Sequence, residues 1–460
     1  MAADIPAMAG SVAAPALRSE PALRPYPSRL IVETTTRCNL SCGHCPRQSA
    51  GAEYDNADMD EKCFASLAEA FPTLEALVLN GIGEPLMHPG LEGFIRRARA
   101  TMPERASIGF QTNGQLLDPK RARSLLEAGL NRVCVSVDAL DSSLFAAIRA
   151  GGSQGAAEQA IATLCAERGK RQEGTAADSH GRGPSSIEIG MEFVAMRQNL
   201  TELPKLVRWA AERKVDFLLV SQLFPYEPSA MQDAAWDTNL DLAVLLRKKY
   251  EKRARTLGLD LSQYPEIYMR LNKSAAEATL VRLVNELQQE ATAQGITVHV
   301  LRLLSADLDI YEQSAAAFSE AARIAALEGL RLELPEIKPR SARSCEFVEG
   351  GSAFISRAGK VHPCYFLWHR YACYAGGWEK RVAPMSFGTL GERGILDIWN
   401  TQEFSSFRTN VLRYDYPFCL NCNLALCDYL QLEDFEQDCH INAEPCAACL
   451  WCMGLFKCLA

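Results

Sequence analysis

Three cysteines near the start of the chain have the spacing of a metal-cluster site. Cys38, Cys42 and Cys45 are separated by three and two residues, and they follow an apolar run at residues 30–36 that predicts a strand. A [4Fe–4S] cluster has four irons and is held by thiolates. Three thiolates on one loop would leave one iron open, where a small molecule can bind and receive an electron.

A tetrahedral zinc site is the alternative chemistry for the same thiolates. Zinc needs a fourth ligand, which His44 or a distant cysteine could supply. The Cys-x3-Cys-x2-Cys run after a first strand resembles the signature of the radical S-adenosylmethionine (SAM) superfamily. The resemblance implies that SAM binds the open iron. An electron from the cluster would then cleave SAM to methionine and a 5′-deoxyadenosyl radical.

Composition and charge limit the other functions open to the chain. Its 460 residues, 48% hydrophobic and 23% charged, are ordinary for a soluble globular protein of about two domains. A net charge of −8 disfavours nucleic acid as a partner, because phosphate binding needs a basic face. No apolar run has the length of a membrane span. Seventeen cysteines in a large chain without an evident export signal indicate metal binding in a reducing cytoplasm.

Strand-like and helix-like runs alternate from residue 29 to residue 225, which predicts a parallel sheet with helices outside it. The resemblance implies an α/β fold, a partial (β/α)6 TIM-like barrel, followed by a Cys-rich domain. Active groups in such barrels lie at the C-terminal ends of the strands. The expected strands are residues 30–35, 76–80, 107–112, 132–137, 187–194 and 216–222.

Three other regions complete the expected organisation. Residues 1–28, rich in Ala and Pro, predict a disordered tail. Residues 226–335 predict a helical bridging segment that could cover the open side of the barrel, with one short strand at 297–300. Residues 336–460 predict the Cys-rich auxiliary domain.

Glycine-rich turns follow the second and third expected strands. Gly81, Gly83 and Glu84 follow the second strand, and they resemble the Gly-Gly-Glu-type motif that hydrogen-bonds the amino group of SAM in the superfamily. Asn113 follows the third strand within a Thr-Asn-Gly run. We expect Asn113 either to contact SAM or to form a structural turn beneath it.

Polar residues also end the later strands. Ser136 and Asp138 lie on one side of the fourth strand, where the resemblance implies ribose contacts, with Ser136 favoured. The run Arg149-Ala150-Gly151-Gly152 resembles a frequent Arg-Gly-Gly run of SAM-dependent maturases, with a helix C-cap as an equal alternative. Glu192 and residues 221–222 are expected to be buried polar groups, satisfied within the barrel, rather than substrate contacts.

The last 120 residues hold eleven cysteines, for which zinc ribbons are the generic interpretation. Their arrangement, together with a Ser-Phe-Gly to Ile-Trp-Asn segment at 386–400, instead resembles the SPASM domain of radical SAM maturases. This resemblance implies a first auxiliary [4Fe–4S] cluster on Cys345, Cys364 and Cys439. It implies a second on Cys419, Cys422, Cys427 and one late cysteine. Two spacings depart from the SPASM pattern, and they leave the assignment of Cys439 open.

The end of the chain has more cysteines than a SPASM domain needs. These are Cys446, Cys449, Cys452 and Cys458, and they resemble the tail of proteins associated with tungsten- or molybdenum-dependent aldehyde oxidoreductases. Because eleven cysteines exceed eight ligand positions, some must be free or form a further metal site. His362 and His440 neighbour these cysteines and could ligate metal or simply pack there.

Taken together, these features predict a cytoplasmic radical SAM maturase that abstracts hydrogen from a protein- or cofactor-borne substrate. Its cofactors would be SAM, the cluster that binds it and two auxiliary [4Fe–4S] clusters. Its partners would be an aldehyde oxidoreductase-type metalloenzyme and an electron donor such as ferredoxin or flavodoxin, with no nucleic acid and no membrane. One alternative is a peptide- or protein-modifying enzyme that forms thioether or formylglycine products. Another is a non-catalytic metal scaffold. No residue is assigned as a catalytic acid or base.

Overall fold

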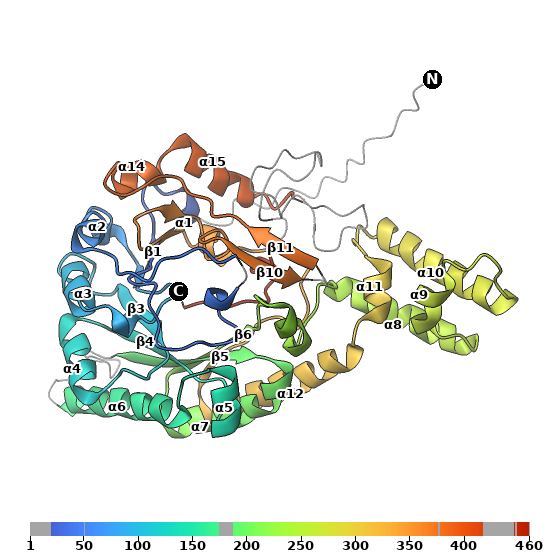
Figure 1. Ribbon diagram of the computed structural model, residues 1–460, viewed down its shortest axis with the longest axis horizontal. Helices are drawn as coiled ribbons and strands as arrows, with labels where there is room; N and C mark the ends of the chain where they lie inside the picture. Colours follow the sequence, from blue (N-terminus) through green and yellow to red (C-terminus); the bar gives the residue numbers. More distant parts are fainter. Residues whose placement is uncertain are drawn as a thin grey trace.

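The protein is built around a curved, nine-stranded sheet with helices on its outer face (Figure 1). The computed structural model describes residues 20–49, 51–173, 187–375, 378–416, 446 and 449–459. All six strands expected for the barrel form, and they pair in parallel in chain order. They are β1 (Arg29–Val32), β2 (Ala76–Val78), β3 (Ser107–Thr112), β4 (Arg132–Ser136), β5 (Glu188–Ala195) and β6 (Phe217–Gln222).

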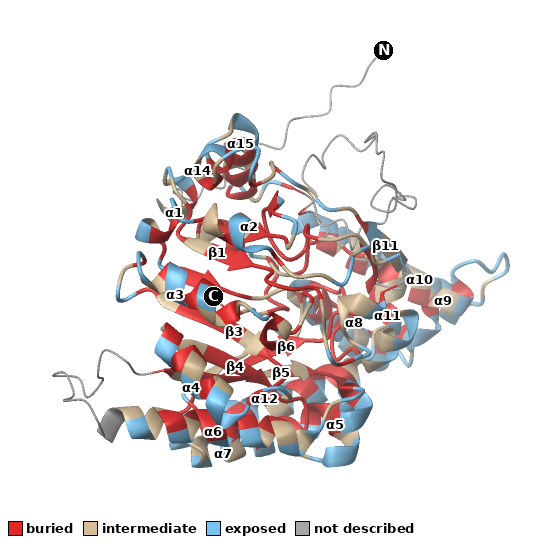
Figure 2. Ribbon diagram, turned by 60° about the vertical axis from the view of Figure 1, so that its left-hand side comes forward, coloured by how far each residue is buried: buried red, intermediate tan, exposed pale blue. Residues whose placement is uncertain are grey.

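The connecting helices bury one apolar face against the sheet. They are α2 (Glu61–Ala65), α3 (Leu91–Arg99), α4 (Pro119–Ala128), α5 (Ser142–Ile148), α6 (Gln154–Glu173) and α7 (Leu203–Glu212). In α4, Asp118 caps the first turn, Leu125 and Leu126 are buried, and Gly129 ends the helix in the left-handed conformation. Figure 2 shows the buried residues concentrated in the strands and on the inner faces of these helices. The expected partial TIM-like barrel is confirmed.

The sheet also extends past the six barrel strands at both edges. β7 (Arg331–Glu333) pairs in parallel with β6. On the other side, β8 (Ser352–Ile355) pairs in parallel with β1, and β9 (Val361–His362) pairs antiparallel with β8. All four residues of β8 are buried. The Cys-rich domain therefore shares its sheet and its hydrophobic core with the barrel.

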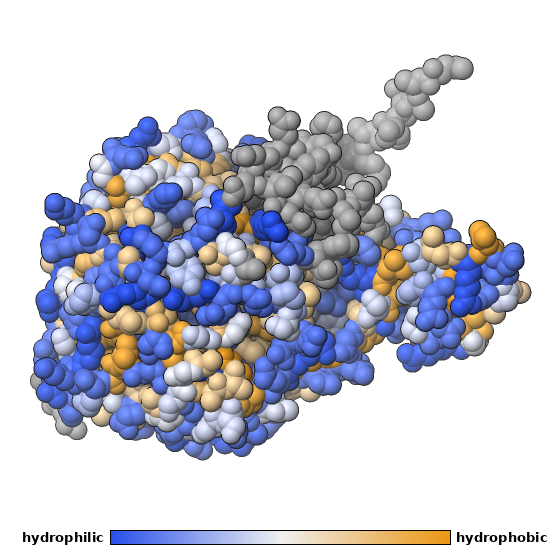
Figure 3. Space-filling model, in the orientation of Figure 1, coloured by the Kyte–Doolittle hydropathy of each residue, from blue (hydrophilic) through white to orange (hydrophobic). Residues whose placement is uncertain are grey.

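The middle segment forms a helical lobe with a hydrophobic core of its own. The lobe consists of α8 (Asp241–Thr256), α9 (Tyr264–Ile267), α10 (Ala275–Ala293) and α11 (Val300–Ser305). It projects away from the barrel, so it does not cover the open side (Figure 1). Figure 3 shows apolar surface on the lobe, where Met269 and Leu271 are exposed. After the lobe, α12 (Leu308–Glu328) returns along α7 to the sheet.

The short strand expected at residues 297–300 is wrong. His299 is the N-cap of α11, and its Nδ1 accepts a hydrogen bond from the backbone N–H of Arg302 at 3.4 Å. An imidazole that satisfies a free N–H at a helix start favours the helix over an isolated strand.

Residues 20–28 are ordered, in contrast to the expected disordered tail at 1–28; residues 1–19 lie outside the described residues. The short helix α1 (Glu20–Leu23) contacts α15 (Gln402–Val411), a helix distant in sequence. The indole of Trp399 donates to the Arg24 carbonyl at 2.9 Å, and Arg408 Nε donates to the Ala22 carbonyl at 2.9 Å. Ser28 is also fully buried. These contacts fix the segment that leads into β1.

The last described segment, residues 449–459, enters the barrel. The backbone N–H of Gln222 donates to the Leu455 carbonyl at 3.1 Å, and the Lys457 N–H donates to Ser221 Oγ at 3.3 Å. Trp451 and Phe456 pack together with ring centroids 4.6 Å apart. Figure 1 shows the C-terminus surrounded by the barrel strands. Among the described residues, the helices are all too short or too polar to span a membrane.

Replacing Arg408 should destabilise the seam between residues 20–28 and the Cys-rich domain. Arg408 is 3% exposed, donates to two carbonyls and lies 3.6 Å above the Trp399 ring. We expect Arg408→Ala to lower the free energy of unfolding by about 2–3 kcal/mol, because its buried carbonyl partners lose a charged donor. Guanidinium denaturation measures this loss. The exposed Arg413→Ala is the matched control, and equal effects of both changes would contradict the expectation.

Candidate functional site

The three-cysteine loop leaves the C-terminal end of β1, as expected. Cys38, Cys42 and Cys45 are partly buried and form no disulfide. Burial, with a smaller contribution from the neighbouring Cys42 and Cys38, raises the pKa of the Cys45 thiol to about 12. Each of these thiols therefore acts electrostatically on another thiol of the same loop. Their thiolate forms need a bound cation, which fits an iron cluster at this loop.

His44 points to a different partner. Its Nε2 lies 3.9 Å from Oδ2 of Asp138, and burial lowers the pKa of its imidazole to about 4. Within the described ranges, no set of three His, Cys, Asp or Glu side chains converges on the position of a single metal ion. A [4Fe–4S] cluster takes one thiolate per iron, so its ligands need not converge in that way.

The loop after β2 lies directly against the exit of β1. A Cβ on Gly83 would lie 2.3 Å from the Thr35 carbonyl oxygen and 2.6 Å from that of Arg37. A Cβ on Gly81 would lie 2.4 Å from Cγ of Glu33. Both glycines are therefore required for this close approach. The approach brings the Glu84 N–H within 2.8 Å of the Arg37 carbonyl, next to Cys38 in sequence.

Glu33, at the end of β1, connects this loop to the Cys-rich domain. Its carboxylate is fully buried and accepts from the Ile82 N–H at 3.2 Å and from the Arg357 N–H at 3.1 Å. His369 Nε2 lies 2.9 Å from the same carboxylate. A single buried group thus joins β1, the glycine loop and two segments of the Cys-rich domain.

Glu84 ties the ends of β2 and β3 together. Its carboxylate accepts from Thr112 Oγ1 at 2.7 Å and from the Asn113 N–H at 2.8 Å. Burial raises the pKa of this carboxyl, and these hydrogen bonds oppose the shift. The Asn113 side chain donates to Asn39 Oδ1 at 2.9 Å, inside the cysteine loop. The Glu84 carboxylate thus supports the loop.

Asp138 does not have the position expected for a ribose contact. It is fully buried, its Oδ2 accepts from Arg149 Nε at 2.7 Å, and its Oδ1 accepts from the Val194 N–H at 2.8 Å. Both of its oxygens are engaged within the protein. Ser136 instead donates to Oε2 of Glu192 at 3.3 Å, across the β4–β5 register.

Arg149 is the site residue that sequence reasoning undervalued. It is the C-cap of α5, as one alternative held, and its side chain also enters the site. Burial would lower its pKa, but Asp138, Cys42 and Glu192 outweigh this and raise it. The next residue, Ala150, accepts from the Ser41 N–H of the cysteine loop at 3.0 Å. The resemblance of residues 149–152 to an Arg-Gly-Gly run was the signal available in the sequence.

A second group of cysteines lines a small pocket in the Cys-rich domain. Its cysteines are Cys345, Cys364, Cys446, Cys449 and Cys452, all of them buried. The rest of the lining is mostly apolar or aromatic: Phe347, Val348, Pro363, Phe366, Phe407, Tyr416 and Trp451. Five thiols around an apolar pocket have the chemistry of a buried iron–sulfur site.

The pocket brings three late cysteines to Cys345 and Cys364, whose expected partner Cys439 lies outside the described residues. The tail runs beside residues 336–344, where the Glu336, Arg340 and Ser344 N–H groups donate to the carbonyls of residues 454, 453 and 452. That pairing brings the late cysteines to the pocket. Cys419, Cys422, Cys427, Cys439 and His440 lie outside the described residues.

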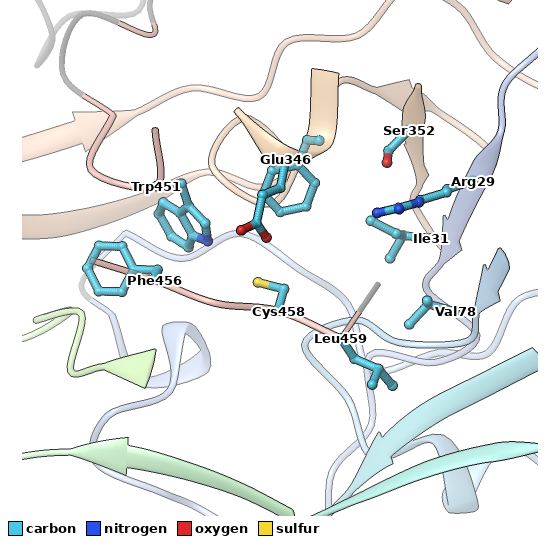
Figure 4. A pocket seen from close by; sticks show the side chains of 10 residues that line it. Arg29, Ile31, Val78, Glu346, Ser352, Trp451, Phe456, Cys458 and Leu459 are labelled. Carbon is cyan, nitrogen blue, oxygen red and sulfur yellow. The ribbon is translucent and has the colours of Figure 1, made fainter. Parts of the chain in front are cut away.

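Cys458 lies apart from this pocket, inside the barrel (Figure 4). It lines a different small pocket together with Trp451 and with Ile31 and Val78 of the barrel strands. Burial raises the pKa of its thiol to about 12. His362 is buried, and its Nδ1 lies 2.7 Å from the Met385 carbonyl oxygen.

Two family models match the chain in the regions of these two sites. Residues 32–175 match the radical SAM superfamily. Residues 345–423 match SPASM, an iron–sulfur cluster-binding domain. The first range contains the three-cysteine loop, and the second begins at Cys345.

Two named proteins and one solved structure illustrate what the chain is similar to. A Pyrococcus furiosus protein, the tungsten-containing aldehyde ferredoxin oxidoreductase cofactor-modifying protein, is 28% identical over 93% of this chain and 96% of its own. A probable GTP 3′,8-cyclase of Halobacterium salinarum is 29% identical over 46% of this chain and 55% of its own. The crystal structure of Streptococcus suis SuiB bound to precursor peptide SuiA is 14% identical, with a TM-score of 0.44, over 87% of this chain and 70% of that one.

Removing the cation at the buried Arg149–Asp138 pair should destabilise the barrel strongly. Arg149→Met leaves the Asp138 carboxylate buried with no cation bonded to it, which costs about 3–5 kcal/mol of unfolding free energy. Denaturation of the apoprotein measures the loss, and Arg149→Met combined with Asp138→Asn should recover part of it. The exposed Arg123→Met, which removes the pair with Glu167, should change little. An Arg149→Met loss no larger than that of Arg123→Met would contradict the assignment.

Iron analysis tests the five-cysteine pocket. Because three thiolates can hold a four-iron cluster and the pocket has five thiols, a single or double substitution is not decisive. The triple variant Cys446→Ala/Cys449→Ala/Cys452→Ala leaves two thiols, and we expect it to bind about four fewer irons per chain than the wild type. Cys373→Ala is the control, since Cys373 is equally buried but does not line the pocket. Unchanged iron in the triple variant would exclude a cluster at this pocket.

Proposed function

The chain belongs to the radical SAM superfamily and carries a SPASM iron–sulfur domain, and from this premise we propose that it modifies the cofactor of a metal-dependent oxidoreductase. The similarity to the P. furiosus cofactor-modifying protein carries the proposal, because it covers 93% of this chain and 96% of that protein. This similarity extends well beyond the two matched family models. It therefore supports a common activity more strongly than either domain alone.

The [4Fe–4S] cluster and SAM supply radical hydrogen-abstraction chemistry when they are bound. We assign Cys38, Cys42 and Cys45 to this cluster. The Arg149 guanidinium, which acts electrostatically on Cys42, suits the carboxylate of SAM. Ser136 is the hydroxyl proposed to contact the ribose, while Asp138 holds Arg149 in position. The Gly81–Gly83 backbone offers the N–H and C=O groups proposed to contact the amino-acid part of SAM.

The auxiliary clusters belong to the SPASM region. We propose that Cys345 and Cys364 hold one of them together with thiols of the Cys446–Cys452 segment, since these groups line one pocket. Cys419, Cys422 and Cys427 remain the proposed ligands of a second auxiliary cluster, completed by one late cysteine. The apolar lining of the described pocket excludes water and suits electron storage near the barrel.

The remaining partners follow from the same chemistry. A low-potential carrier such as ferredoxin or flavodoxin would deliver the electron that SAM cleavage consumes. The protein partner would be an aldehyde oxidoreductase-type enzyme. Seventeen cysteines and oxygen-sensitive clusters suit a reducing cytoplasm.

A Cys42→Ala variant tests the assignment of the SAM-binding cluster and its separation from the auxiliary clusters. With one of three ligands lost, we expect no 5′-deoxyadenosine from SAM under strong reductant, while auxiliary-cluster iron is retained. Cys165→Ala is the control, because that thiol lies on α6 and contacts the Arg213 carbonyl, away from both sites. Chromatography of the nucleoside products gives the readout. Retained cleavage in Cys42→Ala would contradict the ligand assignment.

The same variants test the substrate in cells. An aldehyde oxidoreductase purified without oxygen from cells that produce only Cys42→Ala should carry a cofactor of different mass from that of wild-type or Cys165→Ala cells. Mass spectrometry of the released cofactor measures the difference. Identical cofactors in all three strains would refute cofactor modification. An altered mass of a peptide instead would favour a peptide-modifying enzyme.

A further inference from the structure

Polar side chains gather inside the barrel where β2, β3 and β5 end. Gln111 and Glu192 are partly exposed, whereas the residues on either side of each are buried. Successive residues of a strand point to opposite faces of a sheet, and the outer face of this sheet is covered by helices. The exposure of Gln111 and Glu192 therefore comes from the barrel interior. Their side chains face an open space there.

These side chains form one hydrogen-bonded row across the barrel. Asn80 Nδ2 donates to Gln111 Oε1 at 2.6 Å and lies 3.4 Å from the Tyr365 hydroxyl. Gln111 in turn hydrogen-bonds Glu192, which also accepts from Ser136. The row begins one strand away from the Asp138–Arg149 pair. It ends at Tyr365, the residue that follows the proposed cluster ligand Cys364.

Glu192 has unused hydrogen-bonding capacity. An ionised carboxylate accepts about four hydrogen bonds, and Ser136 and Gln111 supply two. Among the described residues it forms no ion pair, and the nearby Arg149 is bonded through Nε to Asp138. Burial raises the pKa of Glu192 to about 7, with the charge of Arg149 opposing the shift. An enclosed carboxylate of this kind is stabilised by a ligand that brings its own donors.

We propose that Glu192, together with Gln111 and Asn80, binds the substrate through an edge with two adjacent N–H donors and one C=O acceptor. The carboxylate receives both N–H groups, and an amide N–H of the row donates to the carbonyl. A 2-amino-4-oxopyrimidine ring presents this edge, and such a ring occurs in pterins and in guanine. The inference rests on the proposed function, in which the substrate is the cofactor of another enzyme.

Ring binding by the full-chain, cluster-loaded protein tests the proposal. Equilibrium dialysis without oxygen would use two probes, 6-hydroxymethyl-7,8-dihydropterin and guanosine. Each is paired with an analogue that lacks the 2-amino group, lumazine for the pterin and inosine for guanosine. We expect at least one probe to bind at least tenfold more tightly than its analogue. The probe that binds more tightly identifies the ring system.

Two variants on the same strand locate the binding. Glu192→Gln replaces one acceptor by a donor, and we expect it to weaken ring binding at least tenfold while SAM affinity changes less than twofold. Glu188→Gln is the matched control at the opposite end of β5, where Glu188 pairs with Arg132 and Arg331. It should leave ring binding unchanged.

Three results would overturn the proposal: neither probe binds the wild type, the analogues bind as tightly as the probes, or Glu192→Gln weakens SAM binding in place of ring binding. The last result would put Glu192 at the ribose of SAM. Formation of 5′-deoxyadenosine by the same wild-type sample is measured in parallel. Absent cleavage counts against the proposed function itself, whereas intact cleavage without ring binding removes only this inference.

Discussion

The close approach of the glycine loop to the end of β1 is the constraint on which the site depends. At Gly81 and Gly83 no side chain fits between the loop and residues 33–37. Because the backbones lie this close, Glu84 reaches both its own loop and the end of β3, and Asn113 reaches the cysteine loop. The position of the three thiols is thus set by backbone contact with two neighbouring strands. A flexible loop alone would not hold them.

The second site depends on the first through the shared sheet. β8 continues the barrel sheet beside β1, and Glu33 at the end of β1 is bonded to the Arg357 backbone and lies against His369. The residues that lead to Cys364 are therefore anchored on the strand that leads to Cys38. The row from Glu192 to Tyr365 then crosses the barrel interior between these anchors. In the described part of the chain, the barrel and the Cys-rich domain share one sheet and one hydrophobic core.

Local pattern predicted the barrel well, because each strand is an apolar run with its own helix and turn. It also placed the three-cysteine loop and the glycine loop at the correct strand ends. Period-two alternation put Asp138 and Ser136 on one side of the strand. It could not reveal that Arg149 enters the site and donates to the Asp138 carboxylate. Likewise, spacing could not reveal that Cys446, Cys449 and Cys452 line one pocket with Cys345 and Cys364. The pairing of residues 336–344 with the tail is a tertiary contact, and it leaves no periodic signal in either segment.

The pairing of β1 with β8 has a consequence for the way the protein is made. β1 leaves the ribosome early, and its partner at residues 352–355 follows more than three hundred residues later. At about 5–20 residues per second, translation leaves this edge of β1 without its partner for roughly 20–60 seconds. An unpaired apolar strand edge is prone to association with other chains. During this interval the nascent protein can associate with other chains at the edge of β1, and a chaperone that covers this edge would prevent it.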